Sequence, residues 1–73
     1  MTDIEVESNY PSFRLLQGYI KDHQTVEVKL LNGETLTGQV VWQDIHCLYL
    51  QGEESSGSTL IWRQAIAYIQ PKA

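Results

Sequence analysis

The chain has 73 residues, a formal net charge of −4 at pH 7 and a single cysteine, Cys47. This length allows one small domain, and one cysteine excludes an intramolecular disulfide. Five Lys and Arg against nine Asp and Glu argue against a protein that grips phosphates by charge alone. A domain this short buries only about 60% of its unfolded surface, so self-association is the leading way to complete its core.

Metal, export and membrane signals are weak. His23, His46 and Cys47 match no recognised zinc spacing, so we expect neither a metal nor a cofactor. The opening MTDIEVESNYPSF lacks the basic and apolar segments of a signal peptide. No apolar run approaches the roughly 20 residues of a membrane helix. With a lone cysteine, these features predict a cytoplasmic protein without a membrane partner.

Residues 1–10 form a polar leader that carries Asp3, Glu5 and Glu7. Five bases against six acids remain over residues 10–73, so the body is nearly neutral and the leader is acidic. We expect a flexible leader over residues 1–10, the domain over 11–71 and a short tail at 72–73.

A helix is expected over roughly residues 11–22. Pro11 suits its first turn, although Ser12 can serve as the N-cap instead. Apolar residues then recur at helical spacing: Phe13, Leu16, Tyr19 and Ile20.

The period changes to two at residues 26–30, VEVKL, which predicts a half-buried strand. Asn32-Gly33 predicts a two-residue type I′ hairpin turn, because both residues tolerate positive φ. The next strand places Leu36, Gly38, Val40 and Trp42 on one face. Gly38 inside this strand indicates a bend or a close backbone approach.

Residues 46–50 give a third strand, and QGEESSGST at 51–59 has the composition of a loop. LIWRQAIAYIQ then supplies two short strands with a break near residues 64–65, and Pro71 ends the ordered body. One helix and five strands, one of them long and bent, outline a mostly β fold: a small, strongly curved barrel.

At these residues the chain resembles Hfq, the bacterial branch of the Sm/LSm proteins. LLNGETLTGQVVWQD is similar to the first Sm signature, through Asn32, Gly33, Leu36, Gly38 and Asp44. IWRQAIAYIQP is similar to the second, where Hfq typically reads Tyr-Lys-His-Ala-Ile-Ser and ends at a proline. The resemblance covers roughly residues 12–71.

The resemblance implies an Sm-like, SH3-type five-stranded barrel with an N-terminal helix, assembled as a homohexameric ring that binds RNA. In that family the fourth strand of one subunit pairs with the fifth of its neighbour. Short apolar edge strands with Trp62 and Tyr68 are a pairing liability in a monomer, and a closed head-to-tail ring removes every free edge.

The resemblance also implies an RNA site at the pore. His46 occupies the family's aromatic stacking position, and Arg63-Gln64 replaces its Lys-His pair. Ile45 replaces one glutamine, and the helix glutamine falls on or near Ser12. An imidazole can still stack on a base, and Arg63 keeps the positive charge.

On the opposite face, the resemblance places Lys29 where the family has an aromatic platform and Glu34 where it has an apolar residue beside Gly33. An acid on an RNA path opposes a polyanion, so we expect weak RNA binding there. Four positions, Gly33 again among them, are expected to be structural: Asn32, Gly33, Gly38 and Asp44. A general-base role is the alternative for Asp44, but the resemblance favours a carboxylate that hydrogen-bonds turn backbone.

Several residues keep two interpretations. His46 is a pore contact or an ordinary half-buried strand residue. It does not form a nucleophile–base pair with Cys47, because adjacent strand residues point to opposite faces, so no catalytic residues and no enzyme activity are expected. Cys47 is interpreted as a small buried apolar group.

Arg63 is a pore RNA contact or an intersubunit ion-pair partner, and Gln64 reads base edges or bonds across an interface. Trp42 and Trp62 could form a nucleic-acid stacking pair, but their positions on predicted apolar faces favour core or interface packing. The leader and the 51–59 loop are solvated segments unless they contact a protein partner.

The sequence therefore predicts an Hfq-like hexameric regulator of the RNA chaperone type that binds uridine-rich or small regulatory RNA through altered sites. The alternative is a ring-shaped scaffold that has largely lost RNA binding and docks a protein near His46, Arg63 and Gln64 or near Glu34. A monomeric SH3-like module would leave its terminal strands unpaired.

Overall fold

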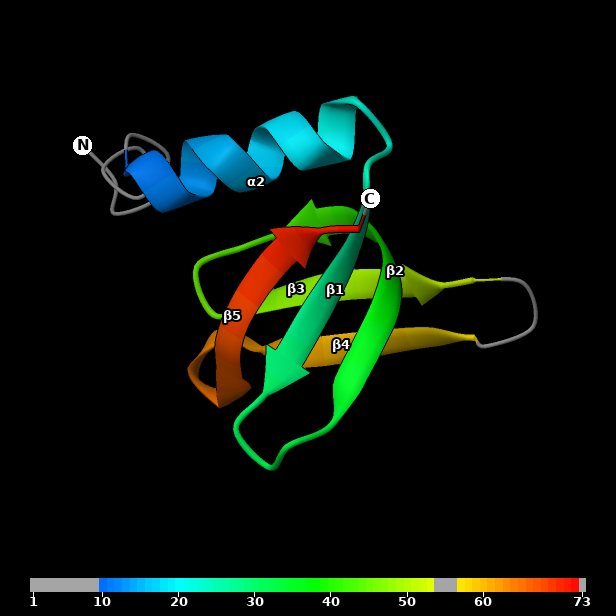
Figure 1. Ribbon diagram of the computed structural model, residues 1–73. Helices are drawn as coiled ribbons and strands as arrows, with labels where there is room; N and C mark the ends of the chain where they lie inside the picture. Colours follow the sequence, from blue (N-terminus) through cyan, green and yellow to red (C-terminus); the bar gives the residue numbers. More distant parts are fainter. Residues whose placement is uncertain (1–9, 54–56, 73) are drawn as a thin grey trace.

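The computed structural model describes residues 10–53 and 57–72, so most of the predicted leader and the middle of the 51–59 loop lie outside it. The elements run in the order α2 (Pro11–Lys21), β1 (Thr25–Leu30), β2 (Thr35–Gln43), β3 (Cys47–Gly52), β4 (Ser58–Trp62), the 3₁₀ turn η1 (Arg63–Ala65) and β5 (Ile66–Pro71). The helix lies across one end of a strongly bent sheet, and the β1–β2 hairpin projects from the other end (Figure 1). The predicted fold, a helix followed by five strands with a break near residues 64–65, is confirmed. The predicted loop over 51–59 is too long, because β3 continues to Gly52 and β4 begins at Ser58.

The helix begins with Pro11 at its first position and has Tyr10 as its N-cap. The alternative of Ser12 as N-cap is wrong, because Pro11 already fits the first turn, where its missing N–H is not needed. At the other end, His23 adopts a positive φ of 53°. The N–H of Gln24 then bonds to the carbonyl of Tyr19 at 3.0 Å, so the helix ends one residue before the predicted limit.

The five strands form one antiparallel sheet in the order β4-β3-β2-β1-β5. Within the described ranges, β4 pairs only with β3 and β5 only with β1, so these two strands are its edges. The sheet curls around a core that the helix covers from one end (Figure 1). The buried cluster consists of Leu16, Val26, Val28, Val40, Leu48, Leu50 and Ile61.

The β1–β2 turn differs from the prediction. The N–H of Leu30 bonds to the carbonyl of Glu34 at 2.8 Å, which makes Leu31, Asn32 and Gly33 the loop. Of these, Gly33 has a positive φ, 97°, and Asn32 does not. The predicted type I′ turn is wrong, because it needs positive φ at both central residues; the chain uses a three-residue loop that ends in a left-handed glycine.

At Gly38 of β2 the backbone of β3 comes very close, as the sequence predicts. A methyl group on Gly38 would overlap the carbonyl oxygen of Gln51 and lie 2.8 Å from its carbonyl carbon.

β2 also shifts register between Val40 and Trp42. The extra residue turns Trp42 outward, where it is 43% exposed and stacks on Tyr49 with ring centroids 5.3 Å apart. The expectation that Trp42 shares the inner face of Val40 is therefore wrong.

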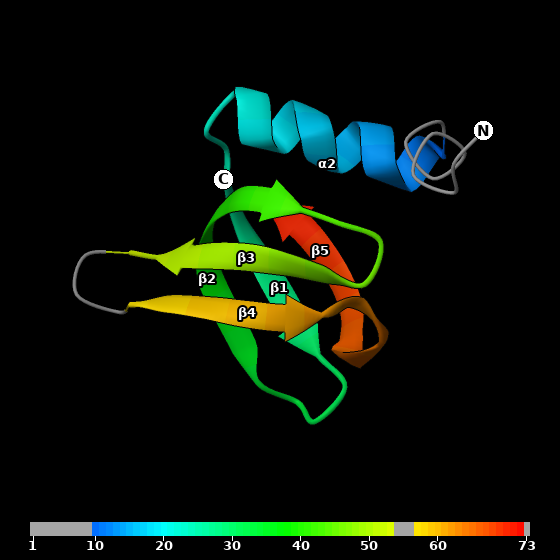
Figure 2. The same ribbon diagram turned by 180° about the vertical axis from the view of Figure 1, so that it is seen from behind.

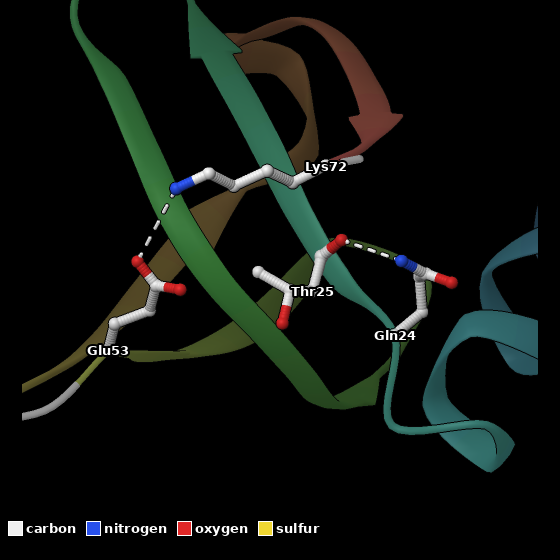
Figure 3. Close-up of polar contacts among 4 residues, drawn as sticks. All are labelled: Gln24, Thr25, Glu53 and Lys72. Atoms are coloured by element: carbon white, nitrogen blue, oxygen red, sulfur yellow. Dashed lines mark hydrogen bonds and ion pairs between the residues drawn. The ribbon is translucent and has the colours of Figure 1, made fainter.

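The C-terminal end of the chain closes against the start of β1. The N–H of Lys72 bonds to the carbonyl of Thr25 at 2.9 Å, and the same oxygen accepts the Gln24 side-chain amide at 3.0 Å. The Lys72 ammonium lies 3.7 Å from the Glu53 carboxylate in an exposed ion pair (Figure 3). Such pairs contribute at most about 1 kcal/mol, so the main-chain bond is the firmer tie.

No helix in the described part of the chain is long and apolar enough to cross a membrane.

Candidate functional site

Two segments distant in sequence meet on one side of the barrel: the β2–β3 turn at residues 44–46 and the turn η1. Both lie on the same side as the N-terminal end of the helix (Figure 2). The N–H of Arg63 bonds to the carbonyl of His46 at 2.8 Å and joins the two segments directly. The side chains of these segments can therefore act as one site.

A groove of about 360 Å³ runs between these segments, lined by Ile45, His46, Trp62, Arg63 and Gln64. His46 and Gln64 are exposed, whereas Ile45 and Arg63 are half-buried. Four of the five predicted pore-face residues thus come together. In this groove the rings of His46 and Trp62 offer stacking surfaces, and the Gln64 amide offers hydrogen-bonding groups.

Ser12, the fifth predicted pore-face residue, does not line this groove. It borders a neighbouring apolar groove of about 260 Å³, whose walls come from the helix, β3, η1 and β5. Arg63 borders both grooves and is the only predicted site residue that they share. Ser12 therefore shares a groove with Arg63 but not with Ile45, His46 or Gln64.

Asp44 organises the β2–β3 turn. Its Oδ1 accepts the N–H of His46 at 2.9 Å and that of Cys47 at 2.8 Å. These two bonds are the main reason that the pKa of Asp44 lies below its ordinary value of 3.8, with smaller contributions from the His46 and Arg63 charges. A carboxylate held ionised in this way stabilises the turn and is a poor proton acceptor.

His46 and Cys47 are adjacent but occupy different environments. His46 is exposed, whereas the side chain of Cys47 is buried with 8% of its surface accessible. Burial, reinforced by the Asp44 carboxylate, raises the pKa of the Cys47 thiol. A buried thiol with a raised pKa is a poor nucleophile, so this pair offers no route to covalent catalysis.

Arg63 is held by three segments of its own chain. Its Nε donates to the carbonyl of Asp44 at 2.9 Å, and a terminal nitrogen donates to Oε1 of Gln43. The guanidinium lies over the Phe13 ring, 4.4 Å from its centroid. Gln43 in turn donates to the Phe13 carbonyl at 3.1 Å and to Gln17 at 2.8 Å.

The opposite-face positions do not line this groove, although the N–H of Leu31 in the same turn bonds to the carbonyl of Ala65 in η1 at 2.8 Å. Gly33 and Glu34 are exposed in the β1–β2 turn, where Asn32 Oδ1 accepts the N–H of Glu34 at 2.9 Å. Lys29 is half-buried and pairs in register with Tyr68 of β5, which is 51% exposed. The exposed Tyr68 ring thus lies beside Lys29, the position where the resemblance expects an aromatic residue and this chain has a lysine.

Three residues have a part in the site that sequence reasoning did not bring out. Phe13 is expected only in the core and Gln43 receives no interpretation. Trp62, expected in core or interface packing, is 51% exposed in the single chain and also lines the groove. Only Trp62 had a usable signal, since it precedes Arg63-Gln64 directly. The roles of Phe13 and Gln43 depend on contacts that no local pattern reveals.

Both edge strands expose large apolar side chains: Leu60 and Trp62 on β4, and Tyr68 on β5. Apolar edges of this kind favour pairing with another strand.

Within residues 10–53 and 57–72, no cluster of three His, Cys, Asp or Glu side chains is placed to hold a metal ion.

The family described as Hfq related matches residues 10–71. A crystal structure of an Hfq protein from Anabaena sp. is 48% identical to the chain, covers 85% of it and 97% of its own length, and superposes with a TM-score of 0.75. A crystal structure described as the pleiotropic translational regulator Hfq is 21% identical to the chain. The match covers 84% of the chain and 98% of that structure's length, with a TM-score of 0.77. The latter likeness concerns the fold alone. No curated protein matches the chain.

Proposed function

Because the chain belongs to the Hfq-related family, we propose that it is an RNA-binding post-transcriptional regulator. Its groove between the β2–β3 turn and η1 takes the bases of uridine-rich RNA. In this proposal the protein acts in the cytoplasm as a chaperone of RNA pairing and catalyses no reaction.

One observation carries the proposal: the gathering of Ile45, His46, Trp62 and Gln64 around one groove. The His46 imidazole is exposed and can stack on a base, as aromatic and histidine side chains do in RNA-binding domains. The Gln64 amide offers both a donor and an acceptor to a base edge. Single-stranded RNA, with its bases unstacked, suits such a site.

The proposed assembly is a homohexameric ring. β4 and β5 are the edges of the sheet and both expose apolar residues, so pairing β4 of one copy with β5 of the next covers both. A head-to-tail contact that closes on itself leaves no free edge. Six copies of one groove around a pore would raise a weak single affinity through avidity.

RNA binding at the opposite face is proposed to be weak. Glu34 is exposed in the hairpin turn and Lys29 is half-buried, so the acid is the more accessible charge. Over residues 10–73 the bases do not exceed the acids, which limits the electrostatic share of any RNA affinity.

The test is fluorescence anisotropy with a short labelled oligouridine at several salt concentrations. We expect saturable binding, and a loss of about tenfold or more for His46→Ala because stacking on one base contributes about 1–3 kcal/mol. His46→Phe, which keeps the stacking surface, is the matched control and should retain affinity. No saturable binding at low salt would overturn the proposal, as would native mass spectrometry that shows a folded lone subunit.

One observation favours the scaffold as the second candidate: Arg63, the cation at the groove, is engaged by Gln43, Asp44 and Phe13 of its own chain. A site without an uncommitted guanidinium suits RNA less well. A pull-down with and without RNase, comparing the native protein with Gln64→Ala, separates the candidates. Capture of one defined protein that survives RNase and is lost in Gln64→Ala favours the scaffold, and capture abolished by RNase favours the RNA-binding regulator.

A further inference from the structure

Arg63 lies where three segments cross: the end of β2, the turn η1 and the first turn of the helix. Its guanidinium donates to the Asp44 carbonyl and to the Gln43 side chain, and one face of it covers the Phe13 ring. Its backbone N–H bonds to the carbonyl of His46. Both the main chain and the side chain of this residue thus hold the β2–β3 turn.

The contacts close into a circuit. Arg63 bonds to Gln43, Gln43 bonds to the Phe13 carbonyl at 3.1 Å, and the Phe13 ring lies under Arg63. Gln43 also bonds to Gln17 one turn further along the helix, at 2.8 Å. Because each member is held by two others, removing one is expected to loosen the rest.

We propose that Arg63 is a positioning residue of the groove. It fixes the turn that carries His46 and the start of the helix against η1, which carries Gln64, and it supports ligand binding through this geometry without contacting the ligand. The inference deepens the proposed function and rests on it for its ligand, a uridine-rich single strand.

The shape of the guanidinium supports this assignment. A bidentate phosphate contact uses two parallel N–H groups on one edge of the plane. In Arg63, Nε and a terminal nitrogen already point at Asp44 and Gln43, and the ring of Phe13 occupies one face. Turning this edge toward a phosphate would break both hydrogen bonds and release the turn.

A consequence for specificity follows. With Arg63 committed to the fold, the groove presents Ile45, His46, Trp62 and Gln64, none of which is a permanent cation. Such a surface recognises bases by stacking and by hydrogen bonds, and it neutralises few phosphates. We therefore expect its affinity for oligouridine to fall only slightly as the salt concentration rises.

Two substitutions distinguish positioning from contact. Arg63→Lys keeps the charge but loses the planar fork, and Gln43→Ala breaks the circuit without changing any charge. We expect both to weaken oligouridine binding by a similar factor of about tenfold at every salt concentration. The slope of log Kd against log salt should stay that of the native protein. Lys21→Gln is the control for charge: Lys21 lies at the other end of the helix, about 12 Å from Phe13 along its axis, and its loss should leave the affinity unchanged.

A direct phosphate contact predicts the reverse. Gln43→Ala would then have little effect, and Arg63→Gln would lower the salt slope by about one for each phosphate that the side chain no longer neutralises. Either of these results would overturn the positioning role. Circular dichroism and native mass spectrometry of each variant establish that the fold and the assembly are kept.

A measurement without RNA keeps this inference separable from the proposed function. Hydrogen exchange at the amides of His46 and Cys47 reports the turn, and we expect faster exchange in both Arg63→Lys and Gln43→Ala. The double variant should be less destabilised than the two single variants added together. If the native protein binds no oligouridine, the proposed function is wrong. The exchange rates and stabilities still test whether Arg63, Gln43 and Phe13 hold the turn together. Unchanged exchange or strictly additive stabilities would overturn the circuit itself.

Discussion

The two turns that flank β2 use the same local device with different results. At one end, Asn32 Oδ1 accepts the N–H of Glu34, two residues on, at 2.9 Å. At the other end, Asp44 Oδ1 accepts the N–H of His46, also two residues on, at 2.9 Å. Side chains of this type commonly bond to backbone two residues later, so both turns form for local reasons.

Their surroundings separate them. The tie of the Asn32 turn to η1 is a main-chain bond, from the N–H of Leu31 to the carbonyl of Ala65 at 2.8 Å. The Asp44 turn is held in addition by the Arg63 side chain, which links it to Gln43 and the helix. A shared local motif therefore does not mark a site. The turn that gains side-chain contacts from distant segments is the one that borders the groove.

The largest expected effect on stability comes from a substitution in β2, the strand that joins the two turns. Gly38→Ala would drive a methyl group into the Gln51 carbonyl, so the backbones of β2 and β3 must separate. We expect a loss of about 3 kcal/mol or more in the free energy of unfolding, measured by denaturant titration at fixed protein concentration. Gly18→Ala, where a methyl group meets nothing within 4 Å, is the matched control and should be neutral or stabilising by up to about 1 kcal/mol. Equal stability of the two variants would contradict the close approach.

The next effect compares the turns directly. Asp44→Ala removes an acceptor shared by two backbone N–H groups, whereas Asn32→Ala removes one that serves a single N–H. We expect Asp44→Ala to lower the midpoint of thermal unfolding more than Asn32→Ala does, and to weaken oligouridine binding because His46 loses its support. A larger loss of stability in Asn32→Ala would show that the hairpin end, not the groove end, anchors the barrel.

A smaller effect is expected from pH. Because the folded pKa of Asp44 is held below its ordinary value of 3.8, its contribution to stability is present above that value and is lost as the pH falls through the lowered pKa. Asp44→Asn lacks this titration. The difference in unfolding midpoint between the native protein and Asp44→Asn should therefore shrink as the pH is lowered from 6 to 2. A difference that stays constant over this range would show that the bonds to the carboxylate do not depend on its charge.

The smallest effect concerns the hairpin end. Gly33 has a φ of 97°, so Gly33→Ala places a side chain in a left-handed conformation at a cost of about 1 kcal/mol. Gly33→Asn should recover part of this loss, because asparagine tolerates positive φ better. Urea titration of the two variants measures the difference, and alanine equal to glycine would contradict the turn described here.

Much of the fold could be predicted from the sequence because its signals are local. The helix at Pro11, the alternating strands, the reversal at Asn32-Gly33 and the break near residues 64–65 each depend on residues a few positions apart. The resemblance to Hfq, carried by the same segments, brought Ile45, His46, Arg63 and Gln64 forward as a group, and these four line one groove. What they bind stays a prediction.

Other features depend on how the barrel packs. The bulge near Val41 turns Trp42 outward, and no period of two along β2 reveals an extra residue opposite β3. The partners of Arg63 lie farther away still, 19 residues back at Asp44 and 20 at Gln43. Which segments become helix, strand and turn follows from the order of the residues, because those choices depend on neighbours along the chain. Whether the arginine beside the groove points outward or into the fold depends on which distant groups surround it, and only the packed barrel brings them together.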